Sequence, residues 1–184
     1  MATKSEKKKD AVRTITFEEV MFSIMAATQD TFKNYMDIDI FSGKVEQKVH
    51  PIDSDVIGIV GVAGDRVGYI IFSTNRKTAI LIARKLTMTD DPDEDTIRDA
   101  VGELANNIAG MFKSKYHEQY GGVYLGLPLV VAGNIRPFGG ESKAPAEAPA
   151  AGAEGAMVRV QTKGVTIPFK SFDGEIYFQV MVYI

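Results

Sequence analysis

A long helical segment at 93–120 constrains the fold of this chain more than any other feature. At roughly 100° per residue, Asp99, Glu103, Asn106 and Gly110 fall within about 60° of one another. We call these four residues the polar row. One face of the helix is therefore predicted to be buried, while the other presents two acids, an amide and bare backbone. The apolar residues on the buried face are Ile97, Val101, Leu104, Ile108, Met111 and Phe112.

Composition excludes several classes of protein. The chain has 184 residues, 45% of them apolar, which suits one domain with a real core. It has no cysteine, so disulfides, thiolate metal sites and a cysteine nucleophile are excluded. Its net charge of −3 gives no reason to expect nucleic acid as a partner. The apolar runs at 56–62 and 127–132 are too short to cross a bilayer, so membrane insertion is not expected.

The N-terminal segment is rich in lysine but lacks the apolar stretch of a secretory signal. We interpret 1–14 as a flexible, solvated tail, the alternative being a role for its lysines at a membrane or nucleic acid. Residues 15–184 are predicted to form a single domain in a cytoplasmic protein. A segment of Ala, Pro, Gly and Glu at 139–155 has no large apolar residue and is predicted to be a flexible insertion.

Local patterns predict the order of the elements. Thr16 and Glu19 have the spacing of a capping box, which predicts a helix over 16–36. Hydrophobic periodicity predicts two more helices and six strands, with Ser73 or Thr74 capping the second helix and Pro128 opening the fourth strand. The fold class is α/β (α+β), with the order helix, three strands, two helices, three strands, and the long third helix carries the site. The expected strands are 37–49, 56–62, 67–72, 127–132, 157–167 and 175–184, and the other helices are 77–88 and 93–120.

The last expected strand, 175–184, is apolar on both faces. A strand of this kind must be covered on both sides or it attracts a partner. Cover from the chain's own helices and a seam between two copies of the chain are both compatible with this pattern.

The sequence lacks the residues that most kinds of catalysis need. His50 and His117 are the only histidines, and they do not have the spacing of metal ligands. No phosphate-binding glycine loop and no nucleophile motif is present. The acids at 90–95 lack the spacing of a calcium loop and suit the start of a helix. A metal site or cofactor of the chain's own is therefore not expected.

The polar row suits one kind of chemistry. The amide of Asn106 does not titrate, but it offers an acceptor and two donors in a fixed plane, which can hold a water in line with a phosphorus atom. Glu103, one turn earlier, can pair with a Lys or Arg beside the target phosphoryl group. A hundredfold acceleration requires only about 2.7 kcal/mol of transition-state stabilisation. A merely solvated helix face remains the alternative interpretation of the same residues.

The sequence Asp99-x-x-x-Glu103-x-x-Asn106, with Pro128 about 22 residues further on, resembles the signature of the CheC/CheX/FliY phosphatases of bacterial chemotaxis. The paired strands at 56–72, with Gly64-Asp65 and Gly68, and the helix at 22–32 resemble the same family. The resemblance covers about 22–184, without the insertion. CheC-like members carry two such motifs, but the first helix here has no E-x-x-N over 23–34, which favours the CheX-type branch.

The resemblance implies a function. The substrate would be the phosphorylated aspartate of a CheY-type response regulator, which brings its own magnesium. Asn106 would orient the attacking water and Glu103 would bind a lysine of the regulator. Asp99, Asn107 and Gly110 would contact this partner, Pro128 would support the site, and the protein would be a homodimer. The alternatives are a module that binds receivers without catalysis and a component associated with the flagellar switch.

Overall fold

The structure is a computed structural model that describes residues 16–48, 50–64, 67–120, 122–135 and 164–183. The expected N-terminal tail at 1–14 and the expected insertion at 139–155 lie outside these residues. No helix among the described residues is long and apolar enough to cross a membrane.

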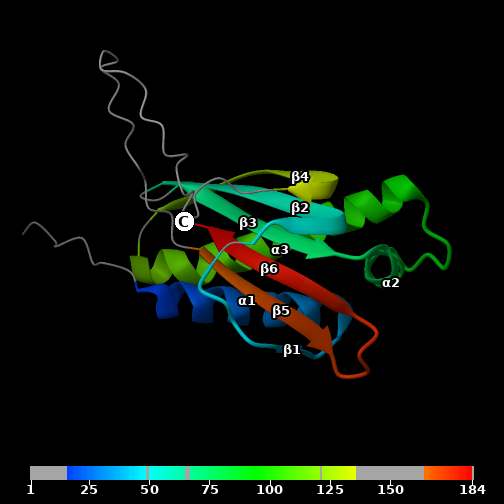
Figure 1. The fold of residues 1–184 in the computed structure, drawn as a ribbon, viewed down its shortest axis with the longest axis horizontal. Coiled ribbons are helices and arrows are strands. Elements are labelled where there is room, and N and C mark those ends of the chain that lie inside the picture. The colour runs from blue at the N-terminus through cyan, green and yellow to red at the C-terminus, as the bar shows by residue number, and fades with distance from the viewer. Residues whose placement is uncertain (1–15, 49, 65–66, 121, 136–163, 184) are drawn as a thin grey trace, which may run out of the picture.

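Within the described residues, the chain forms three helices and six strands in the predicted order (Figure 1). The fold class predicted from the sequence is therefore confirmed. In chain order the elements are α1 (Phe17–Met36), β1 (Ile40–Ser42), β2 (Ile52–Gly64), β3 (Gly68–Thr74), α2 (Arg76–Thr87), α3 (Glu94–Tyr120), β4 (Val123–Ile135), β5 (Gly164–Ser171) and β6 (Tyr177–Tyr183).

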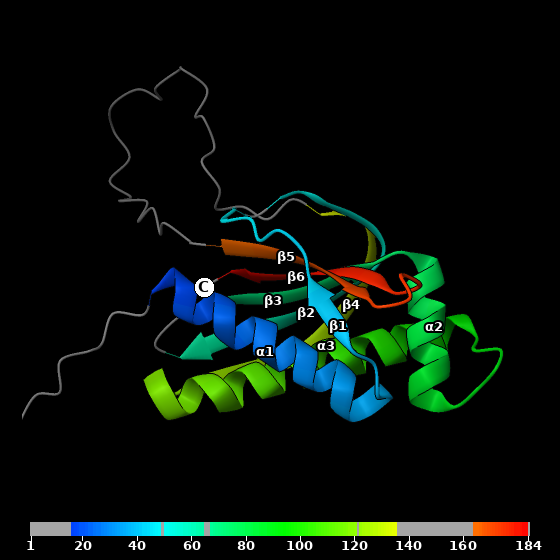
Figure 2. The ribbon, with the colours of Figure 1, turned by 90° about the horizontal axis from the view of Figure 1, so that it is seen from below.

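The six strands form one antiparallel sheet in the order β1-β5-β6-β3-β2-β4. Helices α1 and α3 lie on the same face of this sheet (Figure 2). On the other face, the segment between β1 and β2 passes over the strands (Figure 1). The main core lies between the helices and the sheet, and a smaller cluster of Ile52, Ile57, Ile71 and Met181 is separate from it.

The start of α1 has the predicted capping box. The Thr16 hydroxyl accepts a hydrogen bond from the backbone N–H of Glu19 at 3.2 Å, and the Glu19 carboxylate accepts one from the N–H of Thr16 at 2.9 Å. These bonds satisfy amides that the first turn of a helix leaves without partners. The helix ends at Asp37, which has the left-handed conformation (φ 54°).

Aromatic rings tie α1 to the centre of the sheet. The ring of Phe178 on β6 stacks on that of Phe32 at a centroid separation of 4.5 Å and contacts the ring of Phe72 at 4.9 Å. Strand β6 pairs with β5 on one side and β3 on the other. The strand that is apolar on both faces is thus interior to the sheet: Phe178 belongs to the main core and Met181 to the smaller cluster.

The sequence predictions for the first strand and for the cap of α2 are wrong. Strand β1 covers only Ile40–Ser42 of the predicted 37–49, because Asp37 still caps α1 and only an isolated bridge, Glu46 to Thr166, follows the strand. The cap of α2 is Asn75, whose side chain accepts a bond from the N–H of Thr78 at 2.8 Å. Ser73 and Thr74, the predicted caps, instead pair with β6.

Pro128 does not open β4, which begins at Val123. It lies within the strand, opposite Val60 of β2. Next to it the register shifts, because two residues of β4, Gly126 and Leu127, stand opposite a single residue of β2. Strand β4 is at the edge of the sheet, so a missing N–H is tolerated there. The sequence pattern could not indicate where the edge of the sheet falls.

Helix α3 approaches β2 closely at Gly58. A Cβ on Gly58 would lie 2.8 Å from the Cβ of Ala105 and 3.3 Å from the carbonyl oxygen of Val101. Two small residues therefore allow the helix backbone to come down onto the strand. This contact fixes which side of α3 is buried.

We predict that Gly58→Ala destabilises the fold by about 1–3 kcal/mol, because α3 must move away from β2 to accept the methyl group. Gly61→Ala is the matched control in the same strand, since a Cβ there meets nothing within 4 Å. Urea unfolding of the two variants checks the difference. Equal stability of the two variants would contradict this packing.

Candidate functional site on α3

The first turn of α3 is held by local hydrogen bonds and ion pairs. The Asp93 carboxylate accepts a hydrogen bond from the N–H of Thr96 at 2.8 Å, and its carbonyl accepts one from the N–H of Ile97 at 2.9 Å. Arg76 of α2 pairs with Glu94, and Arg98 pairs with Asp95 at 3.0 Å. These contacts anchor the end of α3 that precedes the polar row.

Two carboxyl groups in this turn titrate abnormally for identifiable reasons. The hydrogen bond from Thr96 lowers the pKa of Asp93 below its usual range. The hydrogen bond from Arg76 lowers the pKa of Glu94. Both shifts favour the ionised carboxylate, which also suits the positive end of the helix dipole.

The two faces of α3 differ as predicted. Asp99, Glu103 and Asn106 are exposed, and Gly110 is half-buried. On the opposite face the side chains of Val101, Leu104, Ala105, Ile108, Ala109 and Phe112 are fully buried. The polar row therefore projects from a helix whose other side is fixed in the core.

The exposed side chains of the polar row have no internal partners. Asp99, Glu103 and Asn106 make no hydrogen bond or ion pair with any residue that the structure describes. Their polar groups are thus available to a molecule outside the protein. At Gly110 a Cβ would meet nothing within 4 Å, so this glycine leaves bare backbone on the same surface.

Asn107 differs from its neighbour Asn106. It is half-buried, and its Nδ2 atom is buried without a hydrogen-bond partner. The predicted contact of Asn107 with a partner remains a prediction, but its amide nitrogen does not face solvent. The sequence alone does not show which of these two adjacent asparagines is exposed, because that depends on how the helix packs.

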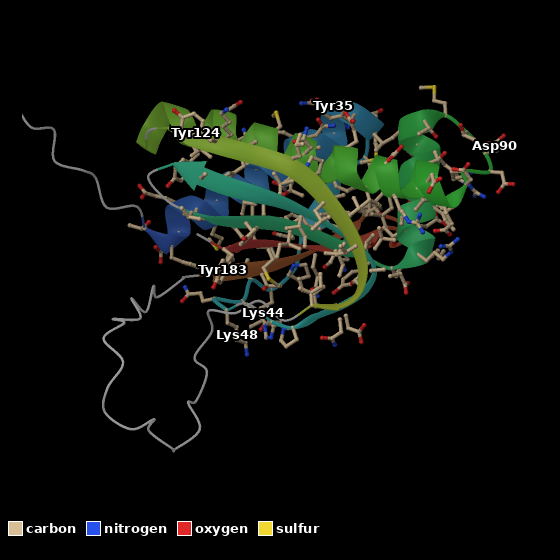
Figure 3. The ribbon with its side chains drawn as sticks, turned by 90° about the horizontal axis from the view of Figure 1, so that it is seen from above. Tyr35, Lys44, Lys48, Asp90, Tyr124 and Tyr183 are labelled. Atoms are coloured by element: carbon tan, nitrogen blue, oxygen red, sulfur yellow. The ribbon has the colours of Figure 1, made fainter. Side chains whose placement is uncertain are left out.

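Strand β4 runs beside α3 (Figure 3). A Cβ on Gly102 would lie 3.1 Å from Cγ2 of Val130 on this strand. Pro128 is two residues before Val130, a rise of about 6.6 Å, and Asn106 is four residues after Gly102, a rise of about 6 Å. Because β4 begins at Val123 and runs back along α3, we infer that Pro128 lies level with Asn106.

Gly102 is a site-supporting residue that the sequence analysis did not identify. It is buried against β4, next to Glu103 in the chain. The available signal was a glycine inside a long helix, where it weakens the helix unless a close contact requires it.

Metal and small-molecule sites are not evident around the polar row. Among the described residues, no group of three or more His, Asp or Glu side chains could hold a metal ion. A hollow of about 620 Å³ lies elsewhere, between α1 and β1, and Gln29, Lys33 and Phe41 are among its lining residues. The polar row itself is a surface, and a surface suits a macromolecular partner.

Several proteins of known structure share this fold. The crystal structure of a chemotaxis protein CheX from Desulfovibrio desulfuricans has a TM-score of 0.70 and 22% identity, over 89% of this chain and 97% of that one. A putative chemotaxis protein from Desulfovibrio vulgaris Hildenborough has a TM-score of 0.69 and 21% identity, over 92% and 98%. These likenesses establish the fold as that of the CheC/CheX class.

A third similar structure is a chain of the CheX–CheY–BeF3–Mg²⁺ complex from Borrelia burgdorferi, with a TM-score of 0.63 and 21% identity over 89% of this chain and 96% of that one. The sequence model of the family described as "Chemotaxis phosphatase CheX" matches residues 56–144. No curated protein matches the sequence. The family match over residues 56–144 and the fold confirm the resemblance recognised from the sequence, which is to CheX-type members of the CheC/CheX/FliY family.

The cap of α3 should make the stability of the fold depend measurably on pH. Because the pKa of Asp93 is lowered in the folded protein, its carboxylate stabilises the fold above the unfolded pKa, and this contribution is lost as pH falls through the folded pKa. Asp93→Asn keeps a capping side chain that does not titrate. We therefore expect this variant to lose less stability than the wild type between about pH 7 and about pH 3.

Urea unfolding at both pH values measures this effect. Asp91→Asn is the control, because Asp91 is on the same turn and makes no hydrogen bond with the described residues. Parallel pH dependences for Asp93→Asn and the wild type would show that the cap does not contribute as inferred.

Proposed function

We propose that this protein is a phosphatase that hydrolyses the aspartyl-phosphate of a CheY-type receiver domain in the cytoplasm. The observation that carries the proposal is the carboxamide of Asn106, which is exposed and without an internal partner on a helix whose opposite face is fully buried. An accessible amide on a helix that is fixed in the core is suited to positioning a single water.

Asn106 would act by orientation. Its side-chain oxygen can accept a hydrogen bond from a water, and its amide hydrogens can donate to a phosphoryl oxygen. Phosphoryl transfer depends mainly on position and charge stabilisation, so a residue that does not titrate can still accelerate it. The attacking water would lose its proton to bulk solvent or to the departing carboxylate, and the phosphorus–oxygen bond to aspartate would break.

Glu103 would dock the receiver. It is one turn before Asn106, so a cation that pairs with its carboxylate would lie beside the group on which Asn106 acts. Asp99 extends the negative charge by one more turn, and Gly110 leaves room for the partner's backbone beyond Asn106. In this arrangement the receiver supplies the magnesium ion, and the phosphatase needs no metal of its own.

The identity of the partner rests on the fold and the family. One similar structure is a complex that contains CheX and CheY together with BeF3 and Mg²⁺. The polar row offers acids for a cation and an amide for a phosphoryl group, which agrees with a phosphorylated receiver as the partner. The main alternative is a module that docks on a receiver, or on the flagellar switch, without catalysis.

Asn106→Ala tests catalysis directly. We expect it to remove most of a roughly hundredfold acceleration of acyl-phosphate decay, while binding to the receiver is retained, because docking depends on Glu103. Asn34→Ala is the matched control, an exposed asparagine on α1. The assay follows loss of phosphate from a labelled receiver with magnesium present.

Glu103→Lys separates the remaining alternatives in the same assay. Reversal of the charge should abolish docking if the polar row is the binding surface, whether or not the protein is an enzyme. Wild-type binding without acceleration would support the binding module and contradict the phosphatase. Wild-type levels of binding in Glu103→Lys would exclude the polar row from docking.

The homodimer implied by the family resemblance is also a proposal. Two features support it: β4 is an edge strand, and Leu127 and Leu129 on it are 92% and 58% exposed. An exposed edge with protruding leucines is a candidate for pairing with a second copy.

If this edge forms the dimer, Leu127→Lys with Leu129→Lys should convert the protein to a monomer, because two charges would have to be buried at the seam. Light scattering coupled to size-exclusion chromatography measures the mass. Phe172→Lys is the control, an exposed apolar residue between β5 and β6, which β3 and β2 separate from β4 in the sheet. A wild-type mass of one chain, or a dimer that survives the double substitution, would contradict this assignment of the seam.

A further inference from the structure

The amide nitrogen of Asn107 is an exception in this fold. It is the one buried side-chain nitrogen or oxygen atom, among the described residues, that has no hydrogen-bond partner. Other buried polar side chains on helices have partners: the hydroxyl groups of Thr28 and Thr31 donate to the carbonyl oxygens of Ile24 and Ala27, both at 2.7 Å. A buried donor without an acceptor is unfavourable, so its presence requires an explanation.

The position of Asn107 on α3 suggests what its acceptor is. It follows Glu103 by four residues, so the two side chains are neighbours on one side of the helix. On its other flank are Ala100, which is buried, and Met111, which packs against the core. Asn107 thus occupies the border between the buried face and the polar row, with its amide reaching inward and Glu103 beside it.

The carboxylate of Glu103, in turn, lacks a hydrogen-bond donor among the described residues. It is exposed, and it makes no ion pair with these residues either. In water this is no disadvantage, because solvent satisfies the carboxylate. Once a partner covers the polar row, water is displaced, and a single cation does not satisfy all the lone pairs of a carboxylate. A second donor from the protein then becomes valuable.

We propose that Asn107 is a positioning residue for Glu103: when a receiver docks, its amide donates a hydrogen bond to the Glu103 carboxylate and holds that group against the partner's cation. The inference rests on the proposed function, since it assumes that Glu103 docks a receiver. In this role Asn107 acts through Glu103, whether or not it also makes the partner contact that the sequence predicts. The donor remains unsatisfied in the free protein because Glu103 is then directed to solvent.

The proposal requires stability and binding to change in opposite directions in one variant. Asn107→Leu replaces the unsatisfied amide by an apolar group of similar size. The free protein should therefore become more stable, by about 3 °C in Tm. Binding to a beryllofluoride-activated receiver should weaken about tenfold, because Glu103 loses its internal donor.

The control is a double-mutant cycle with Glu103→Ala, measured by fluorescence titration of the receiver. If Asn107 acts through Glu103, then Asn107→Leu changes affinity less than about twofold in the Glu103→Ala background. A tenfold loss in both backgrounds, or no loss in the wild-type background, would overturn the proposal. A fall in Tm for Asn107→Leu would overturn it as well, because the amide would then be satisfied in the free fold.

A second measurement is independent of the affinity of the Glu103→Ala variant. The side-chain amide resonance of Asn107 in a nitrogen–proton NMR spectrum should shift downfield on addition of the activated receiver, as a new hydrogen bond forms. An unchanged resonance at saturation would contradict the proposal. Failure of the wild type to bind the receiver at all would instead refute the proposed function, so the two failures are distinguishable.

Discussion

The close approach of α3 to β2 is the constraint on which the rest of this structure depends. Gly58 has no side chain, so Ala105 and the backbone of Val101 can pack directly against the strand at this position. Because this contact sets the rotation of the helix about its own axis, it also decides that Glu103 and Asn106 face outward. A small rotation would move the amide of Asn106 toward β4 or toward α1. The candidate site is therefore a consequence of packing on the far side of the helix, where no polar side chain is involved.

The sequence predicted the order and type of every element that the structure describes, because those predictions used strong local signals. The capping box at Thr16 and the periodicity of α3 depend only on residues a few positions apart. The predictions that failed depended on the sheet. Whether Thr74 ends a strand or begins a helix, and whether Pro128 opens a strand or lies within one, is decided by the neighbouring strand. Strand β1 is short for a related reason, since most of 37–49 finds no continuous partner.

The candidate site could be predicted from the sequence only in part. The exposure of Glu103 and Asn106 followed from helical spacing, and their role was suggested by the family signature. The support behind them was not predictable. The contact of Gly102 with Val130 requires the placement of β4, and the buried amide of Asn107 requires the packed border of α3. Spacing along a helix identifies which side chains share a face, but the neighbouring elements determine which of them can reach solvent.

The role assigned to Asn106 and Glu103 can be tested most directly by a crystal structure of this protein bound to a receiver that carries magnesium and beryllofluoride, a mimic of the phosphoryl group. We predict that α3 lies over the receiver's active site, with Glu103 on a cation of the receiver and the Asn106 carboxamide beside the beryllofluoride, one water apart at most. A receiver bound to another surface, or an Asn106 side chain directed away from the beryllofluoride, would contradict it.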